Sequence, residues 1–223
     1  MLTKVVAHRG ASRAFPENTI EAFRGARALG ADWVELDVRA CADGALAVLH
    51  DSALPDGRPV DTVGAADLPA SVPLLPDALV ACAGMGVNVE IKPHDDPTVT
   101  VATVAVIEAW GGPVLVSSFA PSIVDHVRGL SPGLPTALLT HLLDDPAEVV
   151  AACVDAGHAA LNPWDGTVDE SLVVRCHAAG LAVNVWTVDD PDRVAQLAGW
   201  QVDGIVTNVP DVARSVLEGM AGR

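Results

Sequence analysis

The sequence of 223 residues is poor in basic side chains, with 13 Lys and Arg against 29 Asp and Glu, so its formal net charge is −16. Proteins that bind nucleic acids present basic faces to the phosphates, and anionic membranes attract such faces as well. We therefore expect neither a nucleic acid nor an anionic membrane surface as a partner. A small anionic ligand stays open, because a few local cations outweigh the average field of a protein.

Long apolar runs are also missing, since no segment reaches the roughly 18 uninterrupted apolar residues of a membrane helix. The N-terminal apolar stretch is too short for a signal peptide and is soon followed by His8. The four cysteines are scattered without a CxxC pair, so we expect reduced thiols that mainly fill the core. These features predict a cytoplasmic protein without stable membrane insertion, and they leave its oligomeric state open.

What the sequence contains is a repeat of strand-like runs and helical patterns. Eight runs are expected to be strands: 4–8, 33–38, 87–92, 114–119, 136–140, 159–162, 182–188 and 204–207. Helical patterns cover 19–29, 146–156, 168–179 and 192–197. Strands that alternate with helices indicate a parallel sheet, and eight such units predict an α/β fold of the closed (β/α)₈ TIM-barrel type. The alternative is an open doubly wound sheet, although no GxGxxG motif follows the first strand.

One gap between predicted strands is long and holds a further strand-like run at residues 46–50. The dipeptide Asp43-Gly44 lies between this run and the second strand and is a hairpin signal. We expect residues 46–50 to return beside the second strand, outside the eightfold count. Residues 51–76, rich in Pro, Gly and Asp, are expected to form a loop over one barrel end. No linker divides the chain, so we predict a single domain over residues 1–223.

Acidic side chains lie on the predicted strands, whose ends meet at the C-terminal mouth where barrel active sites are found. Glu35 and Asp37 are two residues apart and share one face of a strand, as do Glu90 and Lys92. A carboxylate that faces a barrel interior is costly to ionise unless it is paired. Mg²⁺ and Ca²⁺ take carboxylate oxygens as ligands. We therefore predict one divalent cation bound by Glu35, Asp37 and Glu90.

Basic and aromatic residues at the same rim have two readings each. Arg9 and Lys92 suit phosphate oxygens, because Arg makes bidentate contacts with them. In an arrangement without a metal, Glu90 and Lys92 would instead form a structural ion pair, while Arg39 or Arg9 would neutralise the other carboxylates. Trp186 is expected to line the mouth against an organic substituent, and the alternative for it is an ordinary place in the core.

Two histidines, His8 and His50, each end a strand-like run beside the acidic cluster. Histidine titrates near neutral pH, so a pair of them can divide the roles of general base and general acid. The sequence does not assign which histidine is the base. No chemistry is expected of the other histidines, which are His94, His126, His141, His158 and His177.

The assembled motifs resemble those of a known family, the glycerophosphodiester phosphodiesterases. The resemblance rests on His8-Arg9-Gly10, Pro16-Glu17-Asn18-Thr19, Glu35-Leu36-Asp37-Val38, His50-Asp51, Glu90-Ile91-Lys92, Ser118-Phe119, Trp186-Thr187 and Asp203-Gly204-Ile205. These motifs occur in the order of that family and span nearly the whole chain. Each is weak alone, and the set is highly specific.

The resemblance implies a TIM-type barrel that acts as a phosphoric diester hydrolase. Its expected substrates are small-molecule glycerophosphodiesters, cleaved to sn-glycerol 3-phosphate and an alcohol with Mg²⁺ or Ca²⁺ as cofactor. The nucleophile would be either water or the glycerol 2-hydroxyl. Carried over residue by residue, the resemblance assigns the metal to Glu35, Asp37 and Glu90, the acid–base pair to His8 and His50, and the substrate contacts to Arg9, Lys92 and Trp186.

Other matched positions are expected to be structural. Asn18 would cap the helix that begins at Thr19, with Glu17 also in a structural role. The family commonly has Thr-Asp after its last strand, where this sequence has Thr207-Asn208, and we expect Asn208 to cap a helix with little effect on catalysis. Segments 52–59 and 72–77 depart from the family pattern, so the alcohol preferred stays open. The remaining alternatives are a phospholipase-like phosphodiesterase acting on lipid head groups and a non-catalytic binding barrel.

Overall fold

Nine strands within residues 3–222, the part of the chain described by the computed structural model, form one sheet. Eight of them are parallel: β1 (Lys4–His8), β2 (Trp33–Ala40), β4 (Gly86–Ile91), β5 (Val114–Ser118), β6 (Thr136–Thr140), β7 (Ala160–Pro163), β8 (Ala182–Val185) and β9 (Gly204–Thr207). Each strand pairs with the next in this order, and β1 pairs with both β2 and β9, which closes the ring. The predicted TIM-type barrel is confirmed, and the open doubly wound sheet is wrong.

The ninth strand, β3 (Leu46–Val48), lies outside the ring and pairs antiparallel with the end of β2. This is the hairpin that the Asp43-Gly44 dipeptide predicts. Gly44 has a φ of 81°, a left-handed conformation that glycine adopts without a steric cost. The hairpin lengthens β2 beyond the barrel and places the segment after β3 at the C-terminal end of the ring.

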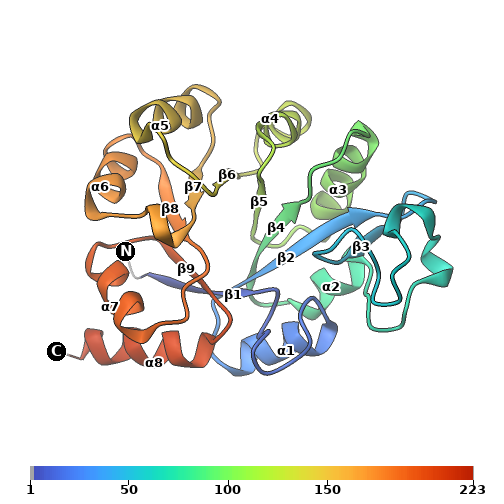
Figure 1. The fold of residues 1–223 in the computed structure, drawn as a ribbon, viewed down its shortest axis with the longest axis horizontal. Coiled ribbons are helices and arrows are strands. Elements are labelled where there is room, and N and C mark those ends of the chain that lie inside the picture. Colours follow the sequence, from blue (N-terminus) through green and yellow to red (C-terminus); the bar gives the residue numbers. More distant parts are fainter. Residues whose placement is uncertain (1–2, 223) are drawn as a thin grey trace.

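Helices surround the ring of strands (Figure 1). They are α1 (Ile20–Ala28), α2 (Leu75–Ala81), α3 (Pro97–Trp110), α4 (Pro121–Leu130), α5 (Pro146–Asp155), α6 (Glu170–Ala178), α7 (Pro191–Gly199) and α8 (Pro210–Ala221). Local sequence explains where several of them begin. The helices α3, α5 and α7 start with an Asp-Pro pair, in which the Asp side chain accepts backbone N–H bonds and the Pro occupies the first turn.

Strand alternation decides which side chains face the helices. In β2 the outward residues Val34, Leu36 and Val38 are fully buried against α-helical side chains. The intervening Glu35 and Asp37 therefore face the barrel interior, as the sequence predicts. Two apolar clusters fill the layer between strands and helices, one around β1–β5 and one around β7–β9. The four cysteines are free and buried, in agreement with the expected reduced thiols.

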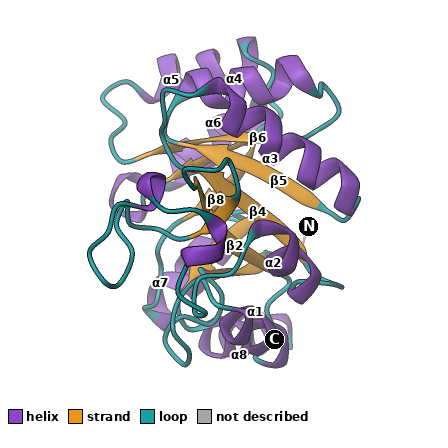
Figure 2. Cartoon of the chain, turned by 90° about the vertical axis from the view of Figure 1, so that its right-hand side faces the viewer, coloured by secondary structure: helices purple, strands orange, loops and turns teal. Residues whose placement is uncertain are grey.

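The segment after β3 is more ordered than the expected loop. It contains two short 3₁₀ turns, Val60–Thr62 and Ala65–Asp67, and its last residues already belong to α2. Apolar side chains of this segment pack with the β2–β3 hairpin in a small cluster of their own, which includes Leu54 and Val72. Long loops lie at the same end of the barrel, on the left of Figure 2. The sequence does not reveal this cluster, because its apolar residues are spread over short turns and follow neither the helical nor the strand period.

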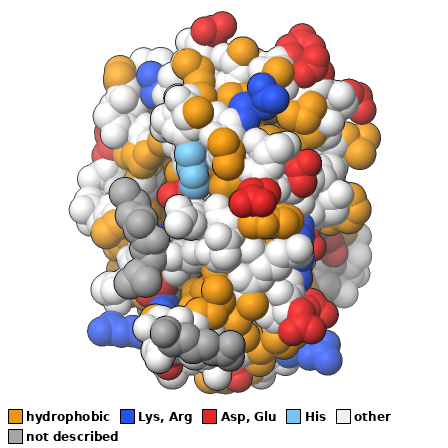
Figure 3. Space-filling model, turned by 90° about the vertical axis from the view of Figure 1, so that its left-hand side faces the viewer, with side chains coloured by type: hydrophobic (Ala, Val, Ile, Leu, Met, Phe, Trp, Pro, Cys, Tyr) orange, Lys and Arg blue, Asp and Glu red, His pale blue; other side chains and the backbone are white. Residues whose placement is uncertain are grey.

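Within residues 3–222 none of the helices combines the length and the apolar composition of a membrane span. On the face seen in Figure 3 the basic side chains lie apart from one another, among acidic, polar and apolar ones.

Candidate active site

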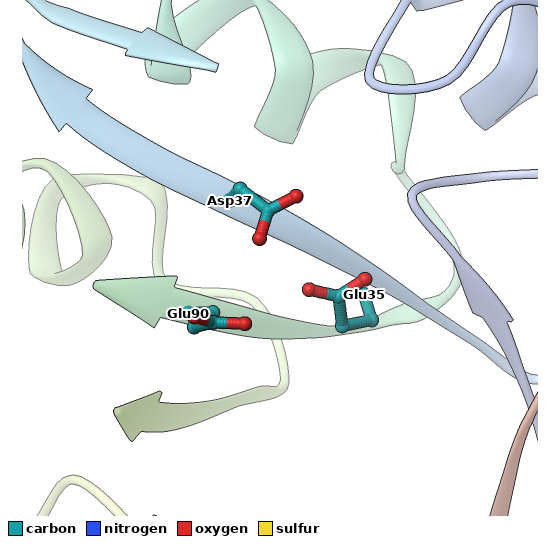
Figure 4. A group of neighbouring side chains, drawn as sticks. All are labelled: Glu35, Asp37 and Glu90. Carbon is teal, nitrogen blue, oxygen red and sulfur yellow. The ribbon is translucent and has the colours of Figure 1, made fainter. Parts of the chain in front are cut away.

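The predicted carboxylates come together because β2 and β4 are parallel neighbours. Their register places Asp37 opposite Glu90, and Glu35 lies two residues earlier on the same face of β2. One ligand atom from each of the three side chains lies within 4.8 Å of the others. Figure 4 shows the carboxylates directed at a common space between the two strands. All three residues are buried, with exposed fractions of 6% or less.

Two basic side chains neutralise part of this charge. The ammonium of Lys92 lies 2.7 Å from Asp37 Oδ1 and 2.6 Å from Glu90 Oε1. The Nε atom of Arg9 lies 3.3 Å from Asp37 Oδ2. Arg39 is not part of the cluster, because its Nε donates to the backbone carbonyl of His50. The Lys92–Glu90 ion pair and the Arg9–Asp37 contact of the arrangement without a metal are thus both present. Two cations face three carboxylates, so one negative charge is left over when all three are ionised.

The pKa values of the carboxyl groups differ because their neighbours differ. Burial, reinforced by repulsion from Asp37 and Glu90, raises the pKa of Glu35 well above its ordinary value. Burial and the charge of Asp37 raise the pKa of Glu90 to about 7. Burial also opposes ionisation of Asp37, but Lys92 and Arg9 outweigh it and lower that pKa.

The donor set fits a hard divalent cation. It consists of carboxylate oxygens alone, which are the ligands that Mg²⁺ and Ca²⁺ prefer. Burial raises the pKa values of Glu35 and Glu90 and so favours their protonated forms. A bound cation would favour the ionised forms instead. Asp37 Oδ1 is buried without a hydrogen bond and has only the ion pair with Lys92. The acidic cluster is therefore a candidate metal site.

Asn18 does not cap α1, contrary to expectation. The cap is Thr19, whose hydroxyl accepts from the backbone N–H of Ala22. Asn18 instead adopts a φ of 56°, and its Nδ2 donates to Asp37 Oδ2 at 2.7 Å. The left-handed backbone turns its amide inward, where it holds a candidate metal ligand in place. Glu17 forms an ion pair with Arg9 at 2.9 Å, in agreement with a structural role.

Both predicted histidines line a cavity of about 300 Å³ at the C-terminal mouth. His8 ends β1, and the β1–β2 register places it beside Glu35, with its Nε2 4.0 Å from Glu35 Oε2. His50 follows β3 and is more exposed, and its Nδ1 lies 2.8 Å from Asp51 Oδ1. Burial, together with the positive charge of Arg9, lowers the pKa of His8 below its ordinary value.

Asn208 also has a different place from the expected helix cap. The residue before α8 is Val209, and no side chain caps that helix. Asn208 lies on the opposite side of β1 from Glu35, and its Oδ1 is 2.8 Å from His8 Nδ1. The motif signals a polar residue after the last strand, but only closure of the ring brings residue 208 to residue 8.

The remaining predicted residues line the same cavity, which is bordered by Arg9, Glu35, Glu90, Lys92 and Trp186 in addition to the two histidines. Asp37 is the one predicted site residue that is not part of this lining. Trp186 is only partly buried, and its indole N–H donates to the backbone carbonyl of Asn162 at 2.9 Å. Trp186 therefore lies at the cavity, and its contact with an organic substituent stays a prediction.

Two further aromatic side chains complete this wall. His141, from which no chemistry is expected, lines the cavity after β6 and stacks on Phe119 with ring centroids 4.7 Å apart. Trp186 meets both rings edge to face, at 5.5 and 4.8 Å. The sequence did not predict a place for His141 in the site. It directly follows β6, and only the position of β6 in the barrel brings it to the cavity.

A larger cavity of about 620 Å³ opens at the other end of the barrel, around the starts of the strands. Its lining includes Lys4, Trp33 and Asp203 but none of the clustered carboxylates and neither predicted histidine of the acid–base pair. The chemistry is therefore concentrated at the smaller, C-terminal cavity.

Comparison with known proteins places the fold and the site in context. The sequence matches the glycerophosphoryl diester phosphodiesterase family over residues 8–212. It is 34% identical to the "Probable glycerophosphodiester phosphodiesterase 2" of Mycobacterium tuberculosis, over 95% of this chain and 89% of that protein. It is 30% identical to a glycerophosphodiester phosphodiesterase of Caldanaerobacter subterraneus, over 95% of this chain and 96% of that protein.

Solved structures agree with these matches. An Oleispira antarctica phosphodiesterase, in complex with the product sn-glycerol-3-phosphate, superposes with a TM-score of 0.91 and 25% identity over 97% of each chain. A glycerophosphodiester phosphodiesterase of Agrobacterium tumefaciens has a TM-score of 0.82 and 26% identity, over 96% of this chain and all of that one. Sequence, barrel and site together show that this chain belongs to the glycerophosphoryl diester phosphodiesterase family.

Proposed function

We propose that this protein hydrolyses glycerophosphodiesters to sn-glycerol 3-phosphate and an alcohol. The observation that carries the proposal is the lining of one cavity at the mouth of the barrel, where two histidines from separate segments flank a cluster of carboxylates. A structure of similar fold holds sn-glycerol-3-phosphate as its product, and relatives in sequence carry the name of the activity.

Glu35, Asp37 and Glu90 are the proposed ligands of one Mg²⁺ or Ca²⁺ ion. When bound, such an ion would act as a Lewis acid and stabilise the negative charge that grows on the phosphoryl oxygens in the transition state. The chain itself contributes the rigidity of the site, because the ligands stand on two hydrogen-bonded strands and Asn18 holds Asp37. Lys92 and Arg9 reduce the repulsion among the carboxylates before the ion arrives.

His8 and His50 are the proposed acid–base pair. One takes a proton from the nucleophile as it attacks phosphorus, and the other donates a proton to the departing alkoxide. Both side chains line the cavity, His8 from the end of β1 and His50 from the segment that follows β3. General acid–base catalysis contributes a factor of about 10² to 10⁴ in rate, so either imidazole is worth about that factor.

Arg9 and Lys92 are the proposed phosphate contacts, and Trp186 is proposed to contact the organic part of the substrate. Arg9 reaches the cavity while it holds Glu17 and Asp37, so its guanidinium is fixed before the phosphate binds. Lys92 acts mainly through its charge, because its ammonium already contacts two carboxylates. The aromatic wall offers ring surfaces to the organic part.

The proposal is tested by incubating the purified protein with glycerophosphocholine, glycerophosphoethanolamine and glycerophosphoglycerol in the presence of Mg²⁺ or Ca²⁺. We expect sn-glycerol 3-phosphate and the corresponding alcohol from at least one of them, detected by phosphorus NMR. His8→Ala should abolish most of this turnover, whereas His126→Ala on α4 is the matched control and should retain it. Calorimetric binding of all three diesters without any product would support a binding barrel and refute the proposed hydrolysis.

A further inference from the structure

A chain of hydrogen bonds behind His8 runs from the cavity to the surface. The Nδ1 atom of His8 lies 2.8 Å from Asn208 Oδ1. On its other side Asn208 donates from Nδ2 to Asp189 Oδ2 at 2.7 Å. The second oxygen of Asp189 accepts from the backbone N–H of Asn208 at 2.8 Å and from the Thr207 hydroxyl at 2.9 Å. Asp189 thus grips the side chain and the backbone of residue 208 together.

The direction of each bond follows from the chemistry of the groups. An ionised carboxylate only accepts hydrogen bonds, so the atom of Asn208 that faces Asp189 must be the amide nitrogen. The amide oxygen then faces His8, and the Ser12 hydroxyl donates to the same oxygen at 2.8 Å. Turning the amide over would place two acceptors together at Asp189, so the observed orientation is the one that satisfies all partners.

An amide oxygen is also only an acceptor, so the ring nitrogen that meets it must carry a proton. We propose that Asp189 and Asn208 are positioning residues that hold neutral His8 in its Nδ1–H tautomer, which leaves the lone pair on Nε2, the ring nitrogen that lies 4.0 Å from Glu35 Oε2. If the protein hydrolyses glycerophosphodiesters as proposed, this tautomer makes His8 the general base, and to that extent the inference rests on the proposed function. The hydrogen bond that fixes the tautomer also fixes the ring orientation. The His8 side chain is only 19% exposed, which further limits rotation of the ring.

The proton balance then assigns both histidines. The nucleophile's oxygen forms a bond to phosphorus while its proton moves to His8 Nε2, which leaves an imidazolium whose Nδ1–H still donates to Asn208. The bond between phosphorus and the leaving oxygen breaks, and the proton that this alkoxide needs comes from His50. Release of the proton from His8 to solvent and uptake of one by His50 restore the resting state, so the cycle consumes only water and the diester.

An exchange of side chains between the two positions provides a sharp test. Asn208→Leu keeps the approximate size of the side chain and removes the acceptor. The double variant Asn208→Asp with Asp189→Asn retains every bond: a carboxylate at 208 accepts from His8, and an amide at 189 donates to it and still accepts from Thr207. Asp192→Asn, in the first turn of α7, removes one negative charge nearby without touching the chain of bonds, and it serves as the control.

We expect Asn208→Leu to lower kcat about 10- to 100-fold, with KM changed less than about threefold because substrate contacts are intact. The exchanged double variant should recover kcat to within about tenfold of the wild type, and Asp192→Asn should leave it unchanged. A loss that the exchange does not repair in a folded double variant would overturn the proposal, as would full activity of Asn208→Leu.

Nitrogen NMR of the chelated, substrate-free protein reads the tautomer without any turnover. The His8 signals, identified by their absence in His8→Ala, should show a protonated Nδ1 and an unprotonated Nε2 in the neutral wild-type ring. Asn208→Leu should shift this balance toward the Nε2–H form. A wild-type spectrum with a protonated Nε2 would overturn the positioning role even if the enzyme is active. The predicted spectrum in a protein that cleaves no glycerophosphodiester would support the positioning role and refute the proposed function alone.

Discussion

Replacing Glu90 by glutamine removes a carboxyl group whose titration should destabilise the metal-free protein. Burial and Asp37 raise the pKa of Glu90 from 4.5 to about 7 in the folded protein. Between these two values the unfolded chain has released this proton and the folded protein still holds it. The stability that Glu90 contributes is therefore complete below about pH 4.5 and is lost as the pH rises through about 7.

The magnitude follows from the size of the shift. One pKa unit corresponds to about 1.4 kcal/mol, so a rise from 4.5 to about 7 amounts to about 3 kcal/mol lost over that interval. For a chain of this size 1 kcal/mol moves the Tm by about 2–4 °C, which gives a loss of about 6–12 °C. Glutamine does not titrate, so Glu90→Gln should gain about this amount relative to the wild type between pH 4.5 and 7.5.

The assay is thermal and denaturant unfolding of both proteins in EDTA at pH 4.5, 6.0 and 7.5. Comparing the two proteins at each pH cancels the groups that Glu90 does not influence, such as His8, whose lowered pKa acts in the opposite direction. Glu108→Gln, on the exposed side of α3, controls for the loss of one carboxylate. A stability gap between Glu90→Gln and the wild type that stays constant with pH would refute the reasoning about burial and repulsion in the cluster.

Three further predictions test other parts of the site. Adding Mg²⁺ or Ca²⁺ to the chelated protein at 100 times the dissociation constant should stabilise it by about 2.7 kcal/mol, seen as a rise in Tm that Glu35→Gln largely removes; equal shifts in both proteins would place the ion elsewhere. His50→Ala should lower kcat by a factor of about 10² to 10⁴ in steady-state assays, and near-normal turnover would exclude His50 as a proton carrier. Asn18→Leu should leave Asp37 without its amide donor and cost about 1–3 kcal/mol in denaturant unfolding, so an unchanged midpoint would contradict the role given to Asn18.

Sequence pattern predicted the parts of the fold that depend on local periodicity. The bounds of β1, β6 and β9 agree with the expected runs, and alternation along β2 correctly divided inward carboxylates from outward apolar residues. The helix α3 was harder to predict, because its apolar residues are not confined to one face. Val99 and Val104 are buried there, whereas Val101 is 46% exposed.

The parts of the site that sequence reasoning missed depend on contacts between distant segments. Asn208 reaches His8 only because β9 pairs with β1 across the closure of the ring. Asn18 has the composition of a helix cap, and its left-handed backbone turns it toward Asp37 instead. His141 is part of the wall because it stacks on Phe119. The two residues lie on different loops, and their spacing in the sequence does not predict this contact. Metal-ligand candidates were easier to predict, because their pairing follows from two neighbouring parallel strands.

The central claim is that the acidic cluster and the two histidines hydrolyse a phosphodiester with the help of one divalent cation. The most direct measurement follows glycerophosphodiester cleavage by phosphorus NMR after exhaustive chelation and then during stepwise addition of Mg²⁺ or Ca²⁺. We predict no turnover in the chelated protein, recovery of sn-glycerol 3-phosphate formation that saturates at one ion per chain, and no recovery in Glu35→Gln. Undiminished turnover after chelation, or equal recovery in Glu35→Gln, would contradict the claim.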